Sequence, residues 1–326
     1  MEIGLVLGKF YPLHKGHEKL IAFGSKNCDK LYVLICAEKK EKITGKTRLK
    51  WIRSTYKNND KIIPILYNYS EKELPNTSKS SKKVSKIWAK VIAQNLPKID
   101  VVFSSEKYGD YLANYLKCKH KPFDIARKKI SIAASTIRQH PIKNWDYIAD
   151  KAKPIFVKKI IIGGTESTGK STLVEKLATH YRTVFVPEMA RDIIANSTNF
   201  QFEDLYTVAK VHANEILKKN KLANKLLFID TDISITKSYA NFFFDKKLKV
   251  SKKIKKANSA DIYLFLDKDA PYIQDGTRLG IEERNKLQKS HLKQLSKQKK
   301  LIIIEGNGEE RFEKAKKEID KLLENW

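Results

Sequence analysis

The chain has 326 residues, 41% of them hydrophobic, which predicts about two globular domains, each with its own core. No run of about 18 apolar residues is present, so we expect no membrane-spanning helix, and the first residues lack the features of a secretory signal. Only nine of the 65 basic residues behind the net charge of +28 are arginine. Because bidentate recognition of phosphates and bases favours arginine, the charge indicates a solvated, lysine-rich surface that attracts anionic small molecules, and no specific nucleic-acid partner.

The cysteines exclude two further classes of protein. Cys28, Cys36 and Cys118 are unevenly spaced and form no CxxC pair. This pattern argues against a disulfide framework or a zinc site and favours a reducing cytoplasm.

The first half of the chain alternates short apolar runs with segments of helical spacing. Such alternation predicts a parallel, doubly wound sheet with helices on its faces. The polar segment 71–86 predicts a mobile loop. The expected strands are residues 2–8, 30–38, 61–69 and 99–106, and the expected helices lie within 17–28, 47–58 and 85–96.

A second series of the same kind begins near residue 154, after a charged segment with a proline. We therefore predict domains at 1–152 and 153–326. The fold class is α/β, with two doubly wound parallel-sheet domains. The expected strands of the second domain are residues 158–162, 183–188, 225–232, 260–267 and 300–306.

The segment "GTESTGKS" matches G-x-x-x-x-G-K-[ST] in full, between a strand and a helix. The backbone N–H groups of such a loop and the helix N-terminus bind phosphates. Lys170 is expected to reach the β- and γ-phosphates of ATP, and Ser171 to hold Mg²⁺. The expected phosphate-binding residues are Gly164, Thr165, Glu166, Ser167, Thr168, Gly169, Lys170, Ser171 and Thr172.

Three features favour a kinase over other nucleotide hydrolases. Glu188 ends a strand, where it can accept a proton from a substrate hydroxyl. Asp230 and Asp232 end another strand, where a carboxylate can hold Mg²⁺, Asp230 being our choice of metal residue. Arg278 lies in a glycine-containing loop that can close over the transferring phosphate. Helix capping by Glu188 or Asp232 and a surface turn at Arg278 are the structural alternatives.

The segment "GKFYPLHKGH" follows the first strand, at the edge of the sheet where doubly wound folds bind ligands. A metal pair of His14 and His17 lacks further ligands nearby. Helix capping is an alternative, but the preferred interpretation is that both histidines donate to a phosphate undergoing substitution. The other residues expected to bind the ATP phosphates here are Gly8, Lys9, Phe10 and Lys15.

This segment resembles the HxGH signature of the nucleotidyltransferase superfamily, specifically the nicotinamide-nucleotide adenylyltransferases. A Rossmann-like fold is implied. "IAASTIRQHP" is similar to the second signature of that superfamily, with Ala133 where serine is usual. The resemblance implies that Ser135, Thr136 and Arg138 contact the ATP phosphates. It also implies that Arg48 in "TGKTR" and Trp88 in "KIWAKV" bind the nicotinamide nucleotide, a core position being the alternative for Trp88.

The whole chain resembles the bifunctional NadR-type enzymes, in which an adenylyltransferase precedes a P-loop ribosylnicotinamide kinase. "FVPEMARD", with Met189 where the family has tyrosine, is similar to their kinase segment and implies that Arg191 binds the riboside. The implied activities convert nicotinamide riboside with ATP and Mg²⁺ into nicotinamide mononucleotide, and the mononucleotide with ATP into NAD and pyrophosphate. Many members carry an N-terminal helix-turn-helix domain. Because the first strand begins near residue 2, we expect no operator-binding role.

The sequence leaves two alternative functions open. A fused coenzyme A synthase-like enzyme also places an HxGH domain before a P-loop kinase, but its usual start differs from "GKF". A basic nucleic-acid-binding P-loop ATPase fits the charge but not the absence of a recognition motif. The sequence leaves the oligomeric state open, a homo-oligomer included.

Overall fold

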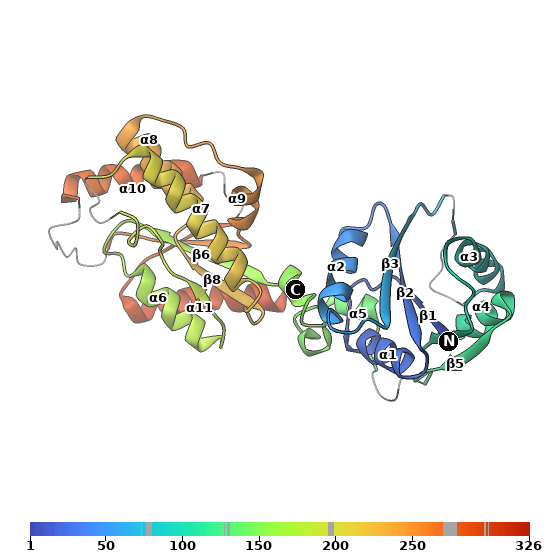
Figure 1. The fold of residues 1–326 in the computed structure, drawn as a ribbon. Helices are drawn as coiled ribbons and strands as arrows, with labels where there is room; N and C mark the ends of the chain where they lie inside the picture. Colours follow the sequence, from blue (N-terminus) through green and yellow to red (C-terminus); the bar gives the residue numbers. More distant parts are fainter. Residues whose placement is uncertain are drawn as a thin grey trace. The chain divides into compact units, whose positions relative to one another are not determined.

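The chain divides into two compact units, and each is described by itself. A computed structural model describes residues 1–326 apart from 73, 76–79, 127, 129–130, 195–198, 270–278, 297 and 299. Unit 1 is Met1–Lys153 and unit 2 is Pro154–Trp326, so the division falls one residue after the predicted boundary. Each unit is a parallel sheet with helices on both of its faces (Figure 1).

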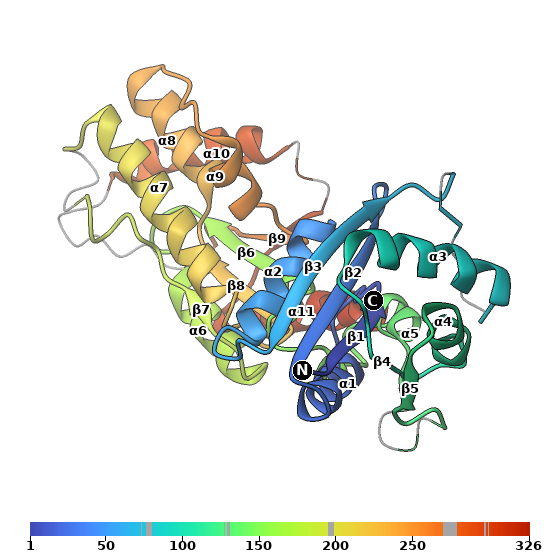
Figure 2. The same cartoon turned by 45° about the vertical axis from the view of Figure 1, so that its right-hand side comes forward.

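Unit 1 has a five-stranded sheet in the order β3-β2-β1-β4-β5. All of its pairings are parallel. Helices α1 and α2 cover one face, whereas α3 and α4 pack their apolar side chains on the other (Figure 2). The strands are β1 (Ile3–Gly8), β2 (Lys30–Glu38), β3 (Ile62–Tyr69), β4 (Val101–Ser104) and β5 (Lys119–Pro122). The helices are α1 (Lys15–Lys26), α2 (Gly45–Thr55), α3 (Lys82–Asn95), α4 (Tyr108–Leu116) and α5 (Ala134–Gln139), followed by 3-10 turns at Trp145–Tyr147 and Lys153–Ile155.

Unit 2 has a five-stranded parallel sheet in the order β10-β9-β6-β8-β7. Helices α6 and α11 pack on one face, and α7, α8, α9 and α10 lie on the other. The strands are β6 (Lys158–Gly164), β7 (Phe185–Val186), β8 (Leu226–Asp230), β9 (Ile262–Leu266) and β10 (Leu301–Ile304). The helices are α6 (Lys170–His180), α7 (Phe202–Lys219), α8 (Ile233–Phe244), α9 (Lys252–Ala257), α10 (Ile281–Leu295) and α11 (Gly308–Glu324).

The predicted fold class is confirmed, because both sheets are parallel and strands alternate with helices. Continuous apolar runs such as those of β1 and β8 identify strands that are buried on both faces. Strand β5 was missed because "KHKP" carries no such run and forms the edge of its sheet. The loop prediction for 71–86 is wrong from Lys82 onward, where α3 begins, and residues 73 and 76–79 lie outside the described part.

In the described part of the chain, no helix combines the length and the apolar character needed to cross a bilayer.

Candidate active sites

The carboxyl end of β1 leads through a short turn into α1, and the two predicted histidines meet there. His14 is the N-cap of α1, and its Nδ1 accepts a hydrogen bond from the Gly16 N–H at 3.1 Å. The centroids of the His14 and His17 rings are 3.7 Å apart, and the Phe10 ring packs edge-on against His17 at 4.9 Å. Helix capping and a place in the candidate site are therefore compatible for His14.

His17 is held as a neutral ring. Burial, with His14 beside it, lowers the pKa of His17 well below its ordinary value. Its buried Nδ1 meets no hydrogen-bond partner within the part of the chain that the structure describes. A polar atom in this position is costly unless a ligand or water satisfies it, which favours a binding role over a packing role.

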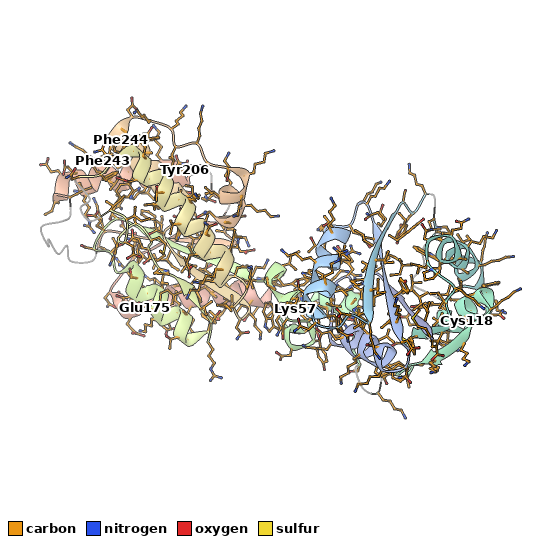
Figure 3. All side chains as sticks on the ribbon, in the orientation of Figure 1. Lys57, Cys118, Glu175, Tyr206, Phe243 and Phe244 are labelled. Atoms are coloured by element: carbon orange, nitrogen blue, oxygen red, sulfur yellow. The ribbon has the colours of Figure 1, made fainter. Side chains whose placement is uncertain are left out.

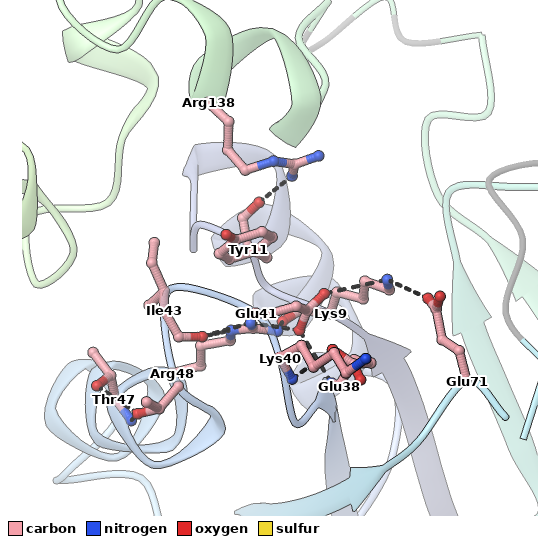
Figure 4. A network of polar contacts seen from close by, with 11 residues as sticks. Lys9, Tyr11, Glu38, Lys40, Glu41, Ile43, Thr47, Arg48, Glu71 and Arg138 are labelled. Carbon is pink, nitrogen blue, oxygen red and sulfur yellow. Dashed lines mark hydrogen bonds and ion pairs between the residues drawn. The ribbon is translucent and has the colours of Figure 1, made fainter. Parts of the chain in front are cut away.

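Figure 4 shows the network that holds this turn, with Arg48 at its centre. The Arg48 side chain is fully buried. Its Nε donates to the Ile43 carbonyl at 3.0 Å, and its guanidinium also donates to the Lys9 carbonyl at 3.1 Å and to Glu41 Oε2 at 2.6 Å. The Lys9 ammonium lies 3.2 Å from Glu41 Oε1. Arg48 thus joins the turn after β1 to the turn after β2, and direct contact with a ligand would require it to leave these partners.

The segment "IAASTIRQHP" contacts the segment "GKFYPLHKGH" through Arg138 and Tyr11. Arg138 of α5 donates to the Tyr11 carbonyl at 2.5 Å, and its guanidinium carbon lies 4.7 Å from the centroid of the Tyr11 ring. The guanidinium carbon of Arg48 lies 4.3 Å from the same centroid. Ser135 and Thr136, on the same short helix, are exposed. Tyr11 therefore brings cationic side chains from distant parts of the sequence to the turn after β1.

Two predicted residues of unit 1 have other surroundings than those expected. Trp88 is buried in the core, where its ring packs edge-on against Tyr69 and its Nε1 donates to the Pro75 carbonyl at 3.2 Å. This is the core position considered as its alternative. The Lys15 ammonium lies 3.1 Å from Glu18 Oε2, within the first turn of α1.

In unit 2, the turn after β6 has the backbone of a phosphate cradle. Gly164 and Gly169 have φ values of 153° and 78°, which favour glycine, and Ser167 also has a positive φ of 58°. The Lys170 ammonium donates to the Thr165 carbonyl at 2.9 Å, and the Thr168 hydroxyl donates to the same oxygen. The turn is thus closed on itself, with the lysine folded across it. Thr172, the last predicted residue, is exposed on α6.

The two predicted metal residues meet. The Ser171 hydroxyl donates to Asp230 Oδ2 at 2.6 Å. Burial raises the pKa of the Asp230 carboxyl, and Lys170 acts in the opposite direction. A hydroxyl and a carboxylate beside a phosphate-binding turn are the oxygen ligands that suit Mg²⁺, so these residues fit a metal–nucleotide complex.

Asp232 has a structural role. Its carboxylate caps α8, accepting from the backbone N–H groups of Ser234 and Ile235, and it also accepts from the Tyr263 hydroxyl at 2.9 Å. The contacts of Asp232 are therefore those of the helix-capping alternative. Asp230 is the carboxylate that contacts the turn after β6.

A pocket of about 250 Å³ opens beside the turn after β6. Glu188 and Arg191 line it and are paired, with Arg191 Nε 3.2 Å from Glu188 Oε2. Phe200 and Tyr239 form an aromatic part of its wall, and Phe200 continues into the rings of Phe243 and Phe244 at the end of α8, labelled in Figure 3. The pocket can therefore accept a flat, partly polar molecule beside a carboxylate.

Sequence reasoning missed several residues of this site. His212 of α7 lines the pocket; burial lowers its pKa to about 4, and its buried Nε2 has no partner among the described residues. Arg284 Nε donates to the Glu166 carbonyl at 3.0 Å, and Arg311 donates to the Thr168 carbonyl. All three lie inside helices far along the chain, where no local motif marks them. Arg278 lies outside the described residues.

These two units define a class of protein. Each carries a turn suited to phosphate at the carboxyl end of its first strand, one with a side-chain network and one with a glycine-rich backbone cradle. The chain is a two-unit α/β nucleotide-binding protein whose second unit has the P-loop form.

Comparisons with known proteins agree with this class. The family model described as AAA domain matches residues 159–311. The trifunctional NAD biosynthesis/regulator protein NadR of Escherichia coli is 29% identical over 294 residues, which cover 85% of this chain and 71% of that protein. The NadR protein of Salmonella typhimurium is 28% identical over 293 residues, again 85% of this chain and 71% of that protein.

Solved structures show the same fold over both units. A crystal structure of a NadR protein with NR gives a TM-score of 0.78 at 19% identity, covering 98% of this chain and 95% of that one. A NadR structure with NAD and AMP-PNP gives 0.77 at 19% identity, covering 99% and 96%. The resemblance predicted from the motifs is confirmed: the chain is similar to the NadR proteins over 85% of its length.

Proposed function

We propose that the chain is a bifunctional NAD salvage enzyme. Unit 2 phosphorylates nicotinamide riboside with ATP, and unit 1 transfers the adenylyl group of ATP to the resulting mononucleotide, releasing pyrophosphate. The single observation that carries this proposal is the presence of both phosphate-binding turns in one chain that is homologous to NadR over both units. The coenzyme A synthase-like alternative is not favoured, because these relatives are NAD enzymes.

In unit 2, Glu188 is the proposed base. Its carboxylate lines the pocket beside Lys170 and Asp230, where a primary hydroxyl of the riboside can approach the γ-phosphate of ATP. Lys170 leaves the Thr165 carbonyl to bind the β- and γ-phosphates, and Arg191 and His212 bind the riboside. Mg²⁺, held by Ser171 and Asp230, supplies charge neutralisation of the phosphates when bound.

In unit 1, the substrate phosphate is itself the nucleophile. It attacks the α-phosphorus of ATP, so the protein needs no nucleophilic side chain, only positioning and charge stabilisation. His14, His17 and Arg138 are the proposed donors to the phosphates, with the backbone of Gly8 to Phe10 and the side chains of Lys9, Lys15, Ser135 and Thr136 around them. Arg48 acts by holding the turn, and Trp88 by packing in the core of unit 1.

The three cysteines are all free, which supports a reducing compartment, and we place the enzyme in the cytoplasm. The function is tested by incubating the purified chain with ATP and Mg²⁺ and with nicotinamide riboside or dephospho-coenzyme A. We expect NAD from the riboside and no turnover of dephospho-coenzyme A. Turnover of dephospho-coenzyme A alone would contradict the proposal.

A further inference from the structure

The turn after β6 contains a carboxylate that the proposed function leaves unexplained. Glu166 lies inside the segment that binds the triphosphate of ATP, where a negative side chain repels phosphate. The residue is half-buried and lines the pocket beside the turn. Its contacts show what the carboxylate does instead of binding phosphate.

The contacts of Glu166 reach two helices that are distant in sequence. The Tyr239 hydroxyl of α8 donates to the Glu166 carboxylate. The Leu279 N–H, directly before α10, donates to Glu166 Oε2 at 3.3 Å. The backbone carbonyl of Glu166 accepts from Arg284 Nε of α10 at 3.0 Å. The residue is therefore held through both its backbone and its side chain, and its carboxylate is directed to the wall of the pocket.

Tyr239 is the partner of Glu166 that belongs to the riboside pocket. It lines the pocket together with Glu188, the proposed base, and its ring stacks on Phe243 with the centroids 5.8 Å apart. Burial, with the Glu166 and Glu188 carboxylates nearby, raises the pKa of Tyr239 well above its ordinary value, so the hydroxyl keeps its proton. A hydroxyl has one hydrogen to donate, and Glu166 receives it. A ring that binds against Tyr239 is thus connected to the ATP turn by a single hydrogen bond.

Glu166 also adjoins the part of the turn that must change when ATP binds. The Lys170 ammonium donates to the carbonyl of Thr165, the residue before Glu166. When Lys170 moves to the β- and γ-phosphates, this closure is lost, and the peptide between Thr165 and Glu166 depends on its remaining contacts. Because the backbone N–H groups of the turn bind phosphates only while the turn keeps its shape, the contacts of Glu166 matter most in the ATP-bound form.

We propose that Glu166 is a positioning residue that couples the two substrates of the kinase, so that nicotinamide riboside binds more tightly when ATP is bound. This inference rests on the proposed function of unit 2. A ring seated on Tyr239 fixes its hydroxyl, and the hydroxyl fixes Glu166 and the turn. Since the shared contacts are ordered only once, the second ligand binds at a lower cost in free energy. Glu166 acts through Tyr239 and the turn, and does not touch the reacting atoms.

The test measures the dissociation constant of nicotinamide riboside by calorimetry in the full chain, with and without saturating AMP-PNP and Mg²⁺. In the wild type, AMP-PNP should tighten riboside binding about tenfold. Glu166→Ala should reduce this factor to about twofold or less, because the link to Tyr239 is removed. Glu166→Gln keeps an acceptor for the Tyr239 hydroxyl and should retain most of the factor.

Tyr239→Phe tests the same link from the pocket, since it keeps the ring and removes only the hydroxyl. It should lower the factor as much as Glu166→Ala, and the double variant should lose no more than either single variant, because all three lack the same hydrogen bond. Tyr239→Phe leaves the turn unaltered and carries the test even if the alanine variant no longer binds AMP-PNP. The matched control is Glu175→Ala, which removes an exposed carboxylate on α6 (Figure 3) and should show the wild-type factor.

The coupling by Glu166 is overturned if the wild type shows no tightening, if Glu166→Ala and Tyr239→Phe keep the wild-type factor, or if Glu175→Ala loses it equally. These outcomes leave the kinase function in place, because the riboside still binds. A wild-type chain that binds AMP-PNP but no riboside would instead overturn the function proposed for unit 2, which separates the two failures.

Discussion

The two phosphate-binding turns achieve the same purpose by different means. In unit 2 the turn after β6 is a backbone device, with positive φ at Gly164 and Gly169 and the Lys170 ammonium closing it on the Thr165 carbonyl. In unit 1 the turn after β1 is a side-chain device, in which Arg48 and Arg138 flank the Tyr11 ring. The first is made from neighbouring residues, and the second depends on residues 39 and 127 positions away from their partners.

This difference predicts different responses to mutation. A backbone cradle loses catalysis but not folding when its lysine side chain is removed. A side-chain cradle loses folding and function together when a member of its network is removed, because buried polar groups are left without partners.

Lys170→Ala tests the backbone device of unit 2. The ammonium is the charge expected on the β- and γ-phosphates, and its loss should reduce riboside phosphorylation by about 10³-fold. Adenylylation of supplied mononucleotide should be unchanged, as measured by pyrophosphate release. Lys176→Ala, an exposed lysine on the same helix, is the control and should retain both activities. A fall in both activities of a folded Lys170 variant would refute separate sites.

Arg48→Ala tests the side-chain device through stability. Loss of the buried guanidinium leaves the Glu41 carboxylate and the Ile43 and Lys9 carbonyls without their partner. The free energy of unfolding of unit 1 should therefore fall by about 3 kcal/mol. Urea unfolding, monitored by the loss of adenylylation activity, should show this decrease. The kinase activity should be lost at the same urea concentration as in the wild type. Arg53→Ala, exposed on the same helix, should change stability by less than about 0.5 kcal/mol. If both changes altered the free energy of unfolding equally, the stabilising role of Arg48 would be contradicted.

His17→Ala tests catalysis in the same turn. The ring offers a buried nitrogen without a described partner, and removing it should lower adenylylation by about 10²-fold. Riboside phosphorylation should continue, so the mononucleotide should accumulate and can be measured by chromatography. His17→Asn keeps a donor and should lose less. An alanine variant with full adenylylation would show that the histidine is a packing residue.

The smallest expected effect concerns pH and a buried histidine of unit 2. Burial, with Lys170 nearby, lowers the pKa of His291 to about 3, below the value of an unfolded histidine. The unfolded chain therefore binds the extra proton first, and stability falls as the pH drops below about 6.5. At pH 5 the loss from this residue should be about 2 kcal/mol relative to pH 8. Urea unfolding of the wild type and of His291→Gln should give a weaker pH dependence in the variant, and equal dependences would contradict the shift.

Sequence alone predicted what is local. The turn after β6 could be predicted residue by residue, because its glycines, Lys170 and Ser171 are consecutive and Asp230 ends a recognisable strand. The fold class followed from apolar runs that parallel strands require. The turn after β1 was located by its histidines for the same reason.

What the sequence could not give depends on tertiary contacts. Arg48 was expected on the nicotinamide nucleotide, but nothing in "TGKTR" indicates that its guanidinium is buried among carbonyls. His212 lies at a helical position that also suits a core residue, so its exposure to a pocket could not be inferred. The hydrogen-bonded residues Ser104, His120 and Asp110 lie on a strand, an edge strand that was itself missed, and a helix, and no spacing rule connects them.

The central claim is that each unit is a complete catalyst. Complementation in solution tests it most directly: Lys170→Ala and His17→Ala chains are supplied with nicotinamide riboside, ATP and Mg²⁺, separately and mixed. Neither chain alone should make NAD, and the mixture should make it, because the mononucleotide released by one chain is the substrate of the other. A mixture that makes none, although each chain keeps its own half-reaction, would contradict the account.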